Sequence, residues 1–150
     1  MVTTEQIKDL RQSTGMSVMQ CKKALESAGG DKEKAIEHLK EQGVKVADKK
    51  SDRELKSGIV SAYVHNNDSI GVLLELACET DFVARNEEFK SLAFELAMQV
   101  AACDPSEVEV LMGQPYIKEP DKTVSDLIKD SVQKFGERIE ISRMTRFEVN

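Results

Sequence analysis

An aromatic residue and a carboxylate stand side by side where one apolar pattern gives way to another. The run Ile70 to Cys78 alternates like a strand, and the run Phe89 to Ala102 has helical spacing. Asp81 and Phe82 fall between the two runs, at a strand-to-helix turn. Turns lie on the surface, where such side chains are available to a partner. Asp81 and Phe82 are therefore the first candidates for function.

The same stretch also holds residue types that can do catalytic or metal chemistry. Glu75 and Glu79 point the same way along a strand and, with Asp81, could form a metal or acid–base cluster. Cys78 could act as a nucleophile with His65. No second motif supports either site, and Cys78 shares an apolar strand face. We expect no catalytic residue, no metal site, no cofactor and no enzymatic activity.

The three cysteines are Cys21, Cys78 and Cys103, and the chain has two histidines. The cysteines are odd in number, far apart and without a CxxC pair, which argues against a zinc site or a disulfide framework. Each falls within an apolar pattern, so we predict buried, small-hydrophobe roles for all three. A reducing compartment fits this pattern.

Composition limits the class of protein. The chain has 150 residues, of which 40% are hydrophobic and 32% charged, and its formal net charge is −6. No apolar run approaches the roughly 20 residues that span a bilayer, and the N-terminus lacks the pattern of a secretory signal. A negative net charge disfavours broad contact with nucleic acid phosphates. We expect a soluble protein without membrane or direct nucleic acid partners.

The N-terminal part is predicted to form three short helices within residues 1–42. Ser17 with Gln20 has the spacing of a capping box at the start of the second helix. Asp31 is a plausible N-cap for the third helix, and Gly43 is expected to end it.

The rest of the chain reads as a linker and a second domain. Residues 44–57 are highly charged, and residues 58–78 read as a β-hairpin. The proline-rich residues 105–122 are predicted to be extended, Thr123 to begin a further helix, and Ile139 to Val149 to form a final strand. The predicted fold class is α+β, with a small three-stranded antiparallel sheet packed with helices. The predicted domains are 1–43, the linker 44–57, and a core at 58–150.

Three motifs carry a family resemblance. They are LRQSTGMSVMQCKKAL at residues 10–25, TDFVARN at residues 80–86, and GERI at residues 136–139 followed by RMTRFE at residues 143–148. In order and spacing the chain resembles elongation factor Ts, the nucleotide-exchange factor for the GTPase elongation factor Tu. The resemblance runs from end to end.

The resemblance implies a role for the turn Thr80, Asp81, Phe82 and Val83. In the family, this turn enters the GTPase beside its nucleotide. The aromatic residue wedges into an apolar pocket and the Mg²⁺ site is disturbed. Phe82 would be the wedge and Asp81 the polar disruptor, while Thr80 and Val83 hold the turn. Without the resemblance, Phe82 reads equally well as a core aromatic, and an N-cap role is the better interpretation of Asp81.

The resemblance also implies that the three helices form a ubiquitin-associated-like module that docks on the GTPase. Its partner-binding loop would comprise Arg11, Thr14, Gly15, Met16, Val18 and Met19. The alternative is an ordinary turn between helices with Met19 in the core.

The chain departs from the family pattern in three places and in length. Met16-Ser17-Val18 stands where Ala-Gly-Met is usual, Gln20 replaces Asp, and Arg138 replaces Asn. The chain is also too short for the second core half and coiled-coil arm of long members. Short members act as homodimers, which the resemblance implies here, through the final strand and the exposed face of the sheet.

We therefore expect elongation factor Tu, both GDP-bound and nucleotide-free, as the partner, together with a second copy of this chain. The expected compartment is the bacterial cytoplasm, with an organelle matrix as the alternative. The competing function is an adaptor that binds a protein through the three-helix module without exchanging nucleotide. An adaptor has no need of Asp81 and Phe82.

Overall fold

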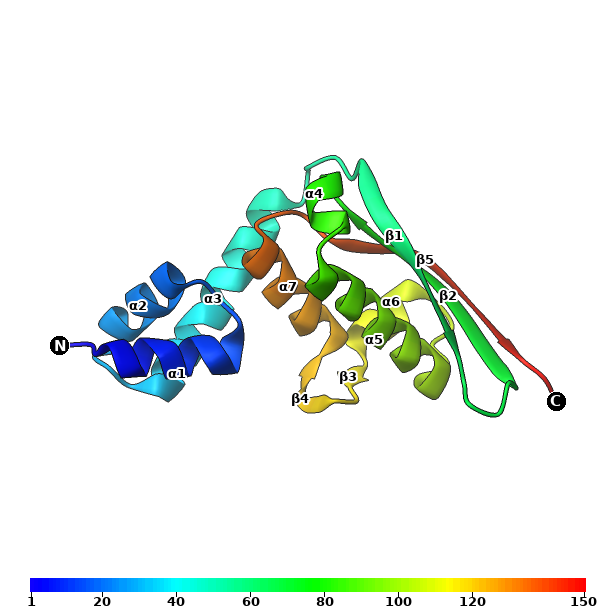
Figure 1. Ribbon diagram of the computed structural model, residues 1–150, viewed down its shortest axis with the longest axis horizontal. Coiled ribbons are helices and arrows are strands. Elements are labelled where there is room, and N and C mark those ends of the chain that lie inside the picture. Colours follow the sequence, from blue (N-terminus) through cyan, green and yellow to red (C-terminus); the bar gives the residue numbers. More distant parts are fainter. The chain divides into compact units, whose positions relative to one another are not determined.

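The computed structural model describes residues 1–150, which divide into two compact units. The first unit comprises residues 1–51 and 129–136, and the second comprises residues 52–128 and 137–150 (Figure 1). Both units are discontinuous in sequence. The predicted domains 1–43 and 58–150 are contiguous in sequence, so these units do not test their boundaries, which stay predictions.

Three helices begin the first unit, as the sequence predicts. They are α1 (Thr4–Thr14), α2 (Val18–Ser27) and α3 (Lys32–Lys50). Thr3 and Ser17 each form a full capping box, and Asp31 accepts a hydrogen bond from the amide of Lys34. These side chains satisfy amides that the first helical turn leaves unpaired. The predicted caps at Ser17 and Asp31 are thus confirmed.

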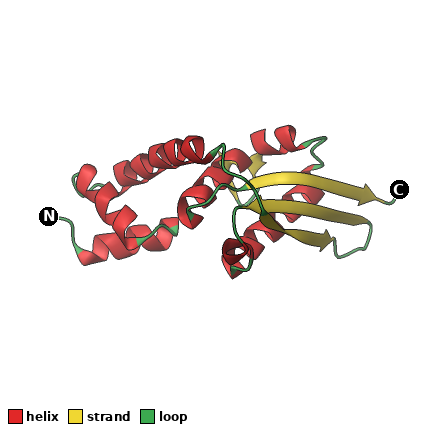
Figure 2. Cartoon of the chain, turned by 90° about the horizontal axis from the view of Figure 1, so that it is seen from above, coloured by secondary structure: helices red, strands yellow, loops and turns green.

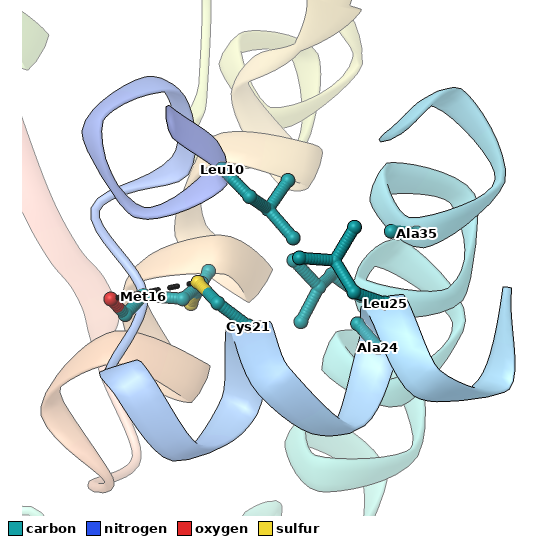
Figure 3. Close-up of a cluster of buried hydrophobic side chains, with 7 residues drawn as sticks. Leu10, Met16, Cys21, Ala24, Leu25 and Ala35 are labelled. Atoms are coloured by element: carbon teal, nitrogen blue, oxygen red, sulfur yellow. Dashed lines mark hydrogen bonds between the residues drawn. The ribbon is translucent and has the colours of Figure 1, made fainter. Parts of the chain in front are cut away.

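A small apolar cluster holds the three helices together. Its buried members are Leu10, Met16, Cys21, Ala24, Leu25, Ala35 and Leu39. Figure 3 shows side chains of α1 and α2 pointing toward one another, with the thiol of Cys21 donating to the carbonyl oxygen of Met16 at 3.9 Å. Small residues at Ala24 and Ala35 let the helices approach closely, so the cluster is compact.

The third helix does not end at Gly43, and that prediction is wrong. Helix α3 continues to Lys50, so residues 44–50 of the predicted linker are helical. A glycine inside a helix costs only about 1 kcal/mol, and Gln42, Lys45 and Ala47 near it are good helix formers. Gly43 is buried, and a Cβ there would lie 2.9 Å from Oε1 of Gln133. Close packing, and not termination, explains this glycine.

The second unit contains the predicted three-stranded antiparallel sheet. Its strands are β1 (Ser57–Val64), β2 (Ile70–Cys78) and β5 (Glu140–Glu148), in the order β1-β2-β5. Figure 2 shows the three strands side by side. The register between β2 and β5 shifts at Glu75 and Leu76. The central strand β2 ends at Cys78, two residues before Thr80.

One face of this sheet is covered and the other is open. Helices α4 (Asp81–Ala84) and α5 (Glu87–Cys103) pack against β1 and β2, and α6 (Val108–Gly113) packs against β5. The covered face and the helices supply most of the buried side chains, among them Val72, Leu74, Leu76, Phe89, Leu96 and Ile141. The open face carries exposed apolar side chains, including Val60, Leu73 and Phe147.

Residues 105–122 are not the extended connection predicted from their prolines. They form α6 and a two-stranded sheet of β3 (Pro115–Tyr116) and β4 (Glu119–Thr123). The fully buried Gln99 holds this hairpin, because its amide donates to the carbonyl oxygen of Pro115 and accepts from the amide of Ile117, both at 3.0 Å. A tertiary contact therefore determines the local structure.

The last helix matches its predicted limits. Helix α7 (Val124–Phe135) follows Thr123, whose hydroxyl oxygen accepts from the amide of Asp126 at 3.1 Å. Gly136 follows with φ 73°, a left-handed conformation that glycine adopts without strain. None of the helices combines the length and the apolar character that crossing a membrane requires.

The cysteine prediction holds for two of the three residues. Cys21 and Cys78 are buried, but Cys103 is exposed at the end of α5. The apolar pattern extends to the last turn of the helix, where Ala102 and Cys103 are both exposed. Periodicity could not show that loss of cover.

Candidate functional site

The turn after β2 is a single helical turn with a side-chain cap. Thr80 is the N-cap of α4, with an extended backbone, and its hydroxyl oxygen accepts from the amide of Val83 at 3.4 Å. Asn86 then caps α5 by accepting from the amide of Glu88 at 2.8 Å. The predicted strand-to-helix turn is therefore present, with Thr80 rather than Asp81 as its cap.

Phe82 points away from the protein. Its side chain is 88% exposed, whereas Val83 and Ala84 are 6% and 5% exposed. Val83 and Ala84 anchor the turn in the core, and the same rotation directs Phe82 to solvent. The interpretation of Phe82 as a core aromatic is wrong. An isolated phenyl ring this exposed is free to contact a partner.

Asp81 is exposed but held. The hydroxyl of Ser57, at the start of β1, donates a short hydrogen bond to Oδ1 of Asp81. The carboxylate therefore has a defined position beside Phe82 while one of its oxygens remains available. No sequence pattern points to Ser57, because the two residues are 24 positions apart.

Glu137 accepts hydrogen bonds from the first residues of the turn. Its Oε1 accepts from the amides of Glu79 and Thr80, both at 3.0 Å, and its Oε2 accepts from the hydroxyl of Thr80 at 2.6 Å. In return, Oε2 of Glu79 accepts from the amide of Arg138 at 2.5 Å. Neither glutamate was expected to hold the turn, although Glu137 lies within the GERI motif.

The residues considered for catalysis have other partners. Burial raises the pKa of the Cys78 thiol, and the charge of Glu137 raises it further. The thiol donates to the carbonyl oxygen of Thr80 at 3.2 Å, so it supports the turn as a neutral group. Glu75 pairs with Arg143 at 3.3 Å. Across residues 1–150, no three His, Cys, Asp or Glu side chains are grouped so that they could hold a metal ion.

The predicted N-terminal loop separates into supporting and exposed residues. Gly15 ends α1 with φ 72°, and the hydroxyl of Thr14 donates to the carbonyl oxygen of Leu10 at 2.7 Å. Met16 is only 4% exposed and belongs to the core. These three residues shape the loop and leave little side-chain surface for a partner.

Val18 and Met19 form the accessible apolar part of this loop. They are 53% and 65% exposed, and Arg11 is exposed as well. The alternative that placed Met19 in the core is wrong, since Met16 occupies that position. The loop and the Thr80–Val83 turn belong to different units, and each keeps its own local geometry.

Comparison with known proteins agrees with the motifs. The family model described as Elongation factor TS matches residues 79–150, which include the turn and Glu137. A protein named elongation factor Ts from Thermodesulfovibrio yellowstonii is 41% identical over 192 positions, covering 99% of this chain and 96% of the relative. Its namesake from Thermotoga petrophila is 42% identical over 191 positions, with 99% and 96% covered.

A third relative extends the same pattern. The elongation factor Ts of Carboxydothermus hydrogenoformans is 39% identical over 194 positions, covering 99% of this chain and 89% of the relative. The three alignments are longer than the 150 residues of this chain, so these relatives have segments that it lacks.

Proposed function

Because the chain belongs to the elongation factor Ts family, we propose that it is a guanine nucleotide-exchange factor for elongation factor Tu. It binds the GDP form of the GTPase, promotes release of GDP and leaves when GTP binds. It acts by binding alone, without making covalent bonds and without a cofactor. The observation that carries the proposal is Phe82, 88% exposed on a turn whose backbone is fixed.

Phe82 supplies the energy for opening the nucleotide site. Burial of an exposed phenyl ring in an apolar pocket contributes roughly 2–3 kcal/mol. A GTPase holds its nucleotide through backbone amides, a P-loop lysine and Mg²⁺ that bridges phosphate oxygens. A wedge beside that site shifts the neighbouring helix, and the exposed oxygen of Asp81 disturbs the Mg²⁺ contacts. The nucleotide then loses contacts that it cannot replace.

The N-terminal helices provide a second contact in this proposal. The exposed side chains of Val18 and Met19 anchor the module on the GTPase, with Arg11 beside them as a charged group. Anchoring holds the factor on its partner while the turn acts. Loss of this contact should therefore weaken binding to the GTPase more than it slows GDP release from the bound complex.

The experiment is stopped-flow release of a fluorescent GDP analogue from elongation factor Tu. Wild type should speed release strongly, and Phe82→Ala should reduce the acceleration roughly 30-fold, the equivalent of a hot spot worth about 2 kcal/mol. Phe82→Leu should keep an intermediate effect. Ile117→Ala, which truncates another exposed apolar residue outside the turn, is the matched control.

The outcome also separates the two candidate functions. Binding of wild type to the GTPase without faster GDP release would contradict exchange and support the adaptor. Equal acceleration by wild type and Phe82→Ala would leave exchange standing but remove the wedge. Circular dichroism of each variant shows that the change is not a loss of fold.

We further propose that a second copy of the chain covers the open face of the sheet. Exposed Val60, Leu73 and Phe147 lie there, and the Glu75–Arg143 pair lies among them. A twofold axis through this face would bring apolar side chains together and let each charged pair meet its symmetry mate. The patch is thus self-complementary in both apolar character and charge.

Light scattering tests the dimer. Phe147→Lys should raise the dimer dissociation constant at least about tenfold, because it buries an unpaired charge. Ile117→Lys, which also adds a charge at an exposed apolar position, should leave the mass unchanged. A wild-type mass of 16.7 kDa at every working concentration would overturn the proposal.

The proposed place of action follows from the proposed partner. Elongation factor Tu works where proteins are synthesised, and we assign the chain to the cytoplasm of a bacterium. Direct contact with nucleic acid or a membrane forms no part of the proposal.

A further inference from the structure

We propose that Glu137 is a positioning residue, which sets the orientation in which the turn Thr80–Val83 meets the GTPase. The inference rests on the proposed exchange function and assigns a part of it to a residue outside the turn. A helix of four residues cannot hold its own orientation, since nucleation of a helical turn is unfavourable. Something else must fix α4, and the carboxylate of Glu137 is placed to do so.

The contacts of Glu137 converge on two consecutive residues. Its carboxylate accepts three hydrogen bonds, from the amides of Glu79 and Thr80 and from the hydroxyl of Thr80, at 3.0, 3.0 and 2.6 Å. Both amides precede α4, so helix hydrogen bonds within α4 do not satisfy them. Hydrogen bonds to a charged acceptor are roughly twice as strong as neutral ones. The carboxylate thus fixes the backbone immediately before Asp81.

The hydrogen bonds between Glu137 and the residues Glu79 and Thr80, which we call the clamp, are matched by a bond in the other direction. Glu79 accepts from the amide of Arg138, the residue after Glu137, so neither chain segment can shift without breaking bonds made by the other. The side chain of Glu79 is only 15% exposed and also pairs with Arg53 at 3.4 Å. The guanidinium of Arg138 donates to the carbonyl oxygen of Arg53 at 2.7 Å. Arg53 therefore offsets the charge of Glu79, while the guanidinium of Arg138 pairs with Glu140 at 3.2 Å.

Thr80 connects this clamp to the helix. Its hydroxyl donates to Glu137 and accepts from the amide of Val83, so one oxygen serves both the clamp and the N-cap. Ser57 in addition restrains the carboxylate of Asp81 by its hydrogen bond. The side chain of Phe82 is 88% exposed, so its direction follows from the backbone of the turn. A wedge fixed in this way is ordered before it meets its partner and pays less entropy on binding.

Positioning has a kinetic signature. The N-terminal module docks without help from Glu137, so loss of the clamp should leave the half-saturating concentration of the factor within about threefold. The maximal rate of GDP release should fall about tenfold in Glu137→Ala, because the turn samples unproductive orientations. Glu137→Gln keeps an acceptor of the same length for the two amides and should retain most of the rate. Glu107→Ala, which removes an exposed glutamate without a side-chain cap bond, is the control.

Amide hydrogen exchange of the free protein tests the clamp without any partner. Glu137→Ala should lose protection specifically at Glu79 and Thr80, while amides of α5 stay protected. If Glu137→Ala does not fold, Glu137→Asp takes its place, since a carboxylate one methylene shorter cannot reach all three donors. The same loss of local protection and of maximal rate is expected.

The outcomes distinguish the clamp from the function on which it rests. Unchanged protection at Glu79 and Thr80 overturns the clamp, whatever the release rates. Lost protection with an unchanged maximal rate overturns the positioning role and leaves exchange intact. If the wild type itself fails to accelerate release, the proposed function fails and the positioning role fails with it.

Discussion

Phe82 and Val83 are neighbours of similar character, yet their environments are opposite. Phe82 is 88% exposed and Val83 is 6% exposed, because a single helical turn directs one to solvent and the other into the core. Met16 and Met19 show the same contrast, at 4% and 65% exposed. At the scale of the residue, exposure rather than residue type identifies the candidate contacts.

Substitution at the N-terminal loop should separate binding from stability. Val18→Ser with Met19→Ser should weaken binding to elongation factor Tu at least about tenfold and change the free energy of unfolding little, because both side chains are exposed. Met16→Ala should lower the free energy of unfolding by about 2–5 kcal/mol, as expected for a buried methionine. Fluorescence titration and urea unfolding measure the two quantities. A large loss of stability in the double variant would contradict this division.

The three thiols should differ in reactivity. Cys103 is exposed, Cys21 is buried, and burial raises the pKa of Cys78. We expect one thiol per chain to react with Ellman's reagent in the native protein, and three after unfolding in urea. Cys103→Ser should abolish the native reaction. Rapid reaction of a second thiol in native Cys103→Ser would show that a buried site opens.

The sequence predicted the residues of the turn but not what holds them. Thr80 to Val83 form a contiguous motif, and a contiguous motif can be identified without a structure. Glu137 contacts Thr80 across 57 positions, and Ser57 contacts Asp81 across 24. Both contacts depend on tertiary structure, because β1 and the residues before β5 must come close to the turn. No local sequence pattern encodes that approach.

At the scale of the element, one buried glutamine organises a hairpin that the sequence did not reveal. Strands β3 and β4 have two and five residues, too few to be stable without tertiary support. The amide of Gln99 supplies that support by bonding to Pro115 and Ile117. The prolines of the segment predicted extended backbone because they exclude helix locally, whereas the hairpin depends on a residue of α5.

Loss of this amide should destabilise the second unit. Gln99→Leu leaves the amide of Ile117 and the carbonyl of Pro115 buried without partners, which costs about 1–3 kcal/mol each. Urea unfolding should report a fall of that order. Gln12→Leu, at an exposed position of α1, should change stability little. Equal stability of the two variants would mean that water replaces the lost bonds.

Glu95 should make stability depend on pH. Burial alone raises the pKa of Glu95, but hydrogen bonds from Lys118 and Tyr116 outweigh burial and lower that pKa below its ordinary value. A lowered folded-state pKa stabilises the protein above the unfolded-state pKa, and this contribution is lost as the pH falls through the folded-state value. On acidification, the free energy of unfolding of Glu95→Gln, measured with urea, should therefore fall less than that of wild type. If the free energies of unfolding of the two proteins fall equally at acid pH, Glu95 is not the source of the pH dependence.

Element type was predictable where the pattern was long, and element ends were not. The stripe of α5 and the alternation of β2 each repeat an apolar residue often enough to define a period. Gly43 was misread as the end of α3 because a glycine is a stop signal only when the chain leaves the helix there. The buried Gln133 next to Gly43 comes from α7, so the reason for this glycine lies 90 positions away in sequence.

At the scale of the whole molecule, the two proposed contacts lie in different units. The loop with Val18 and Met19 belongs to the first unit, and the turn with Phe82 belongs to the second. In our account the first contact anchors the factor, and the second acts on the nucleotide site. Each contact can therefore be removed by substitution without altering the local structure of the other.

Coupling between nucleotide and factor should be reciprocal. If the factor weakens GDP binding by a given ratio, GDP must weaken factor binding by the same ratio. Titration of nucleotide-free and GDP-bound elongation factor Tu should therefore give dissociation constants that differ at least about tenfold, or about 1.4 kcal/mol. Phe82→Ala should reduce this ratio. Equal affinity for both forms would be incompatible with exchange.

The most direct measurement is the rate of GDP release from elongation factor Tu as a function of the concentration of this chain. We expect the rate to rise to a plateau far above the spontaneous rate, and Phe82→Ala to lower the plateau. If release stays at its spontaneous rate where binding is complete, the chain is not a nucleotide-exchange factor.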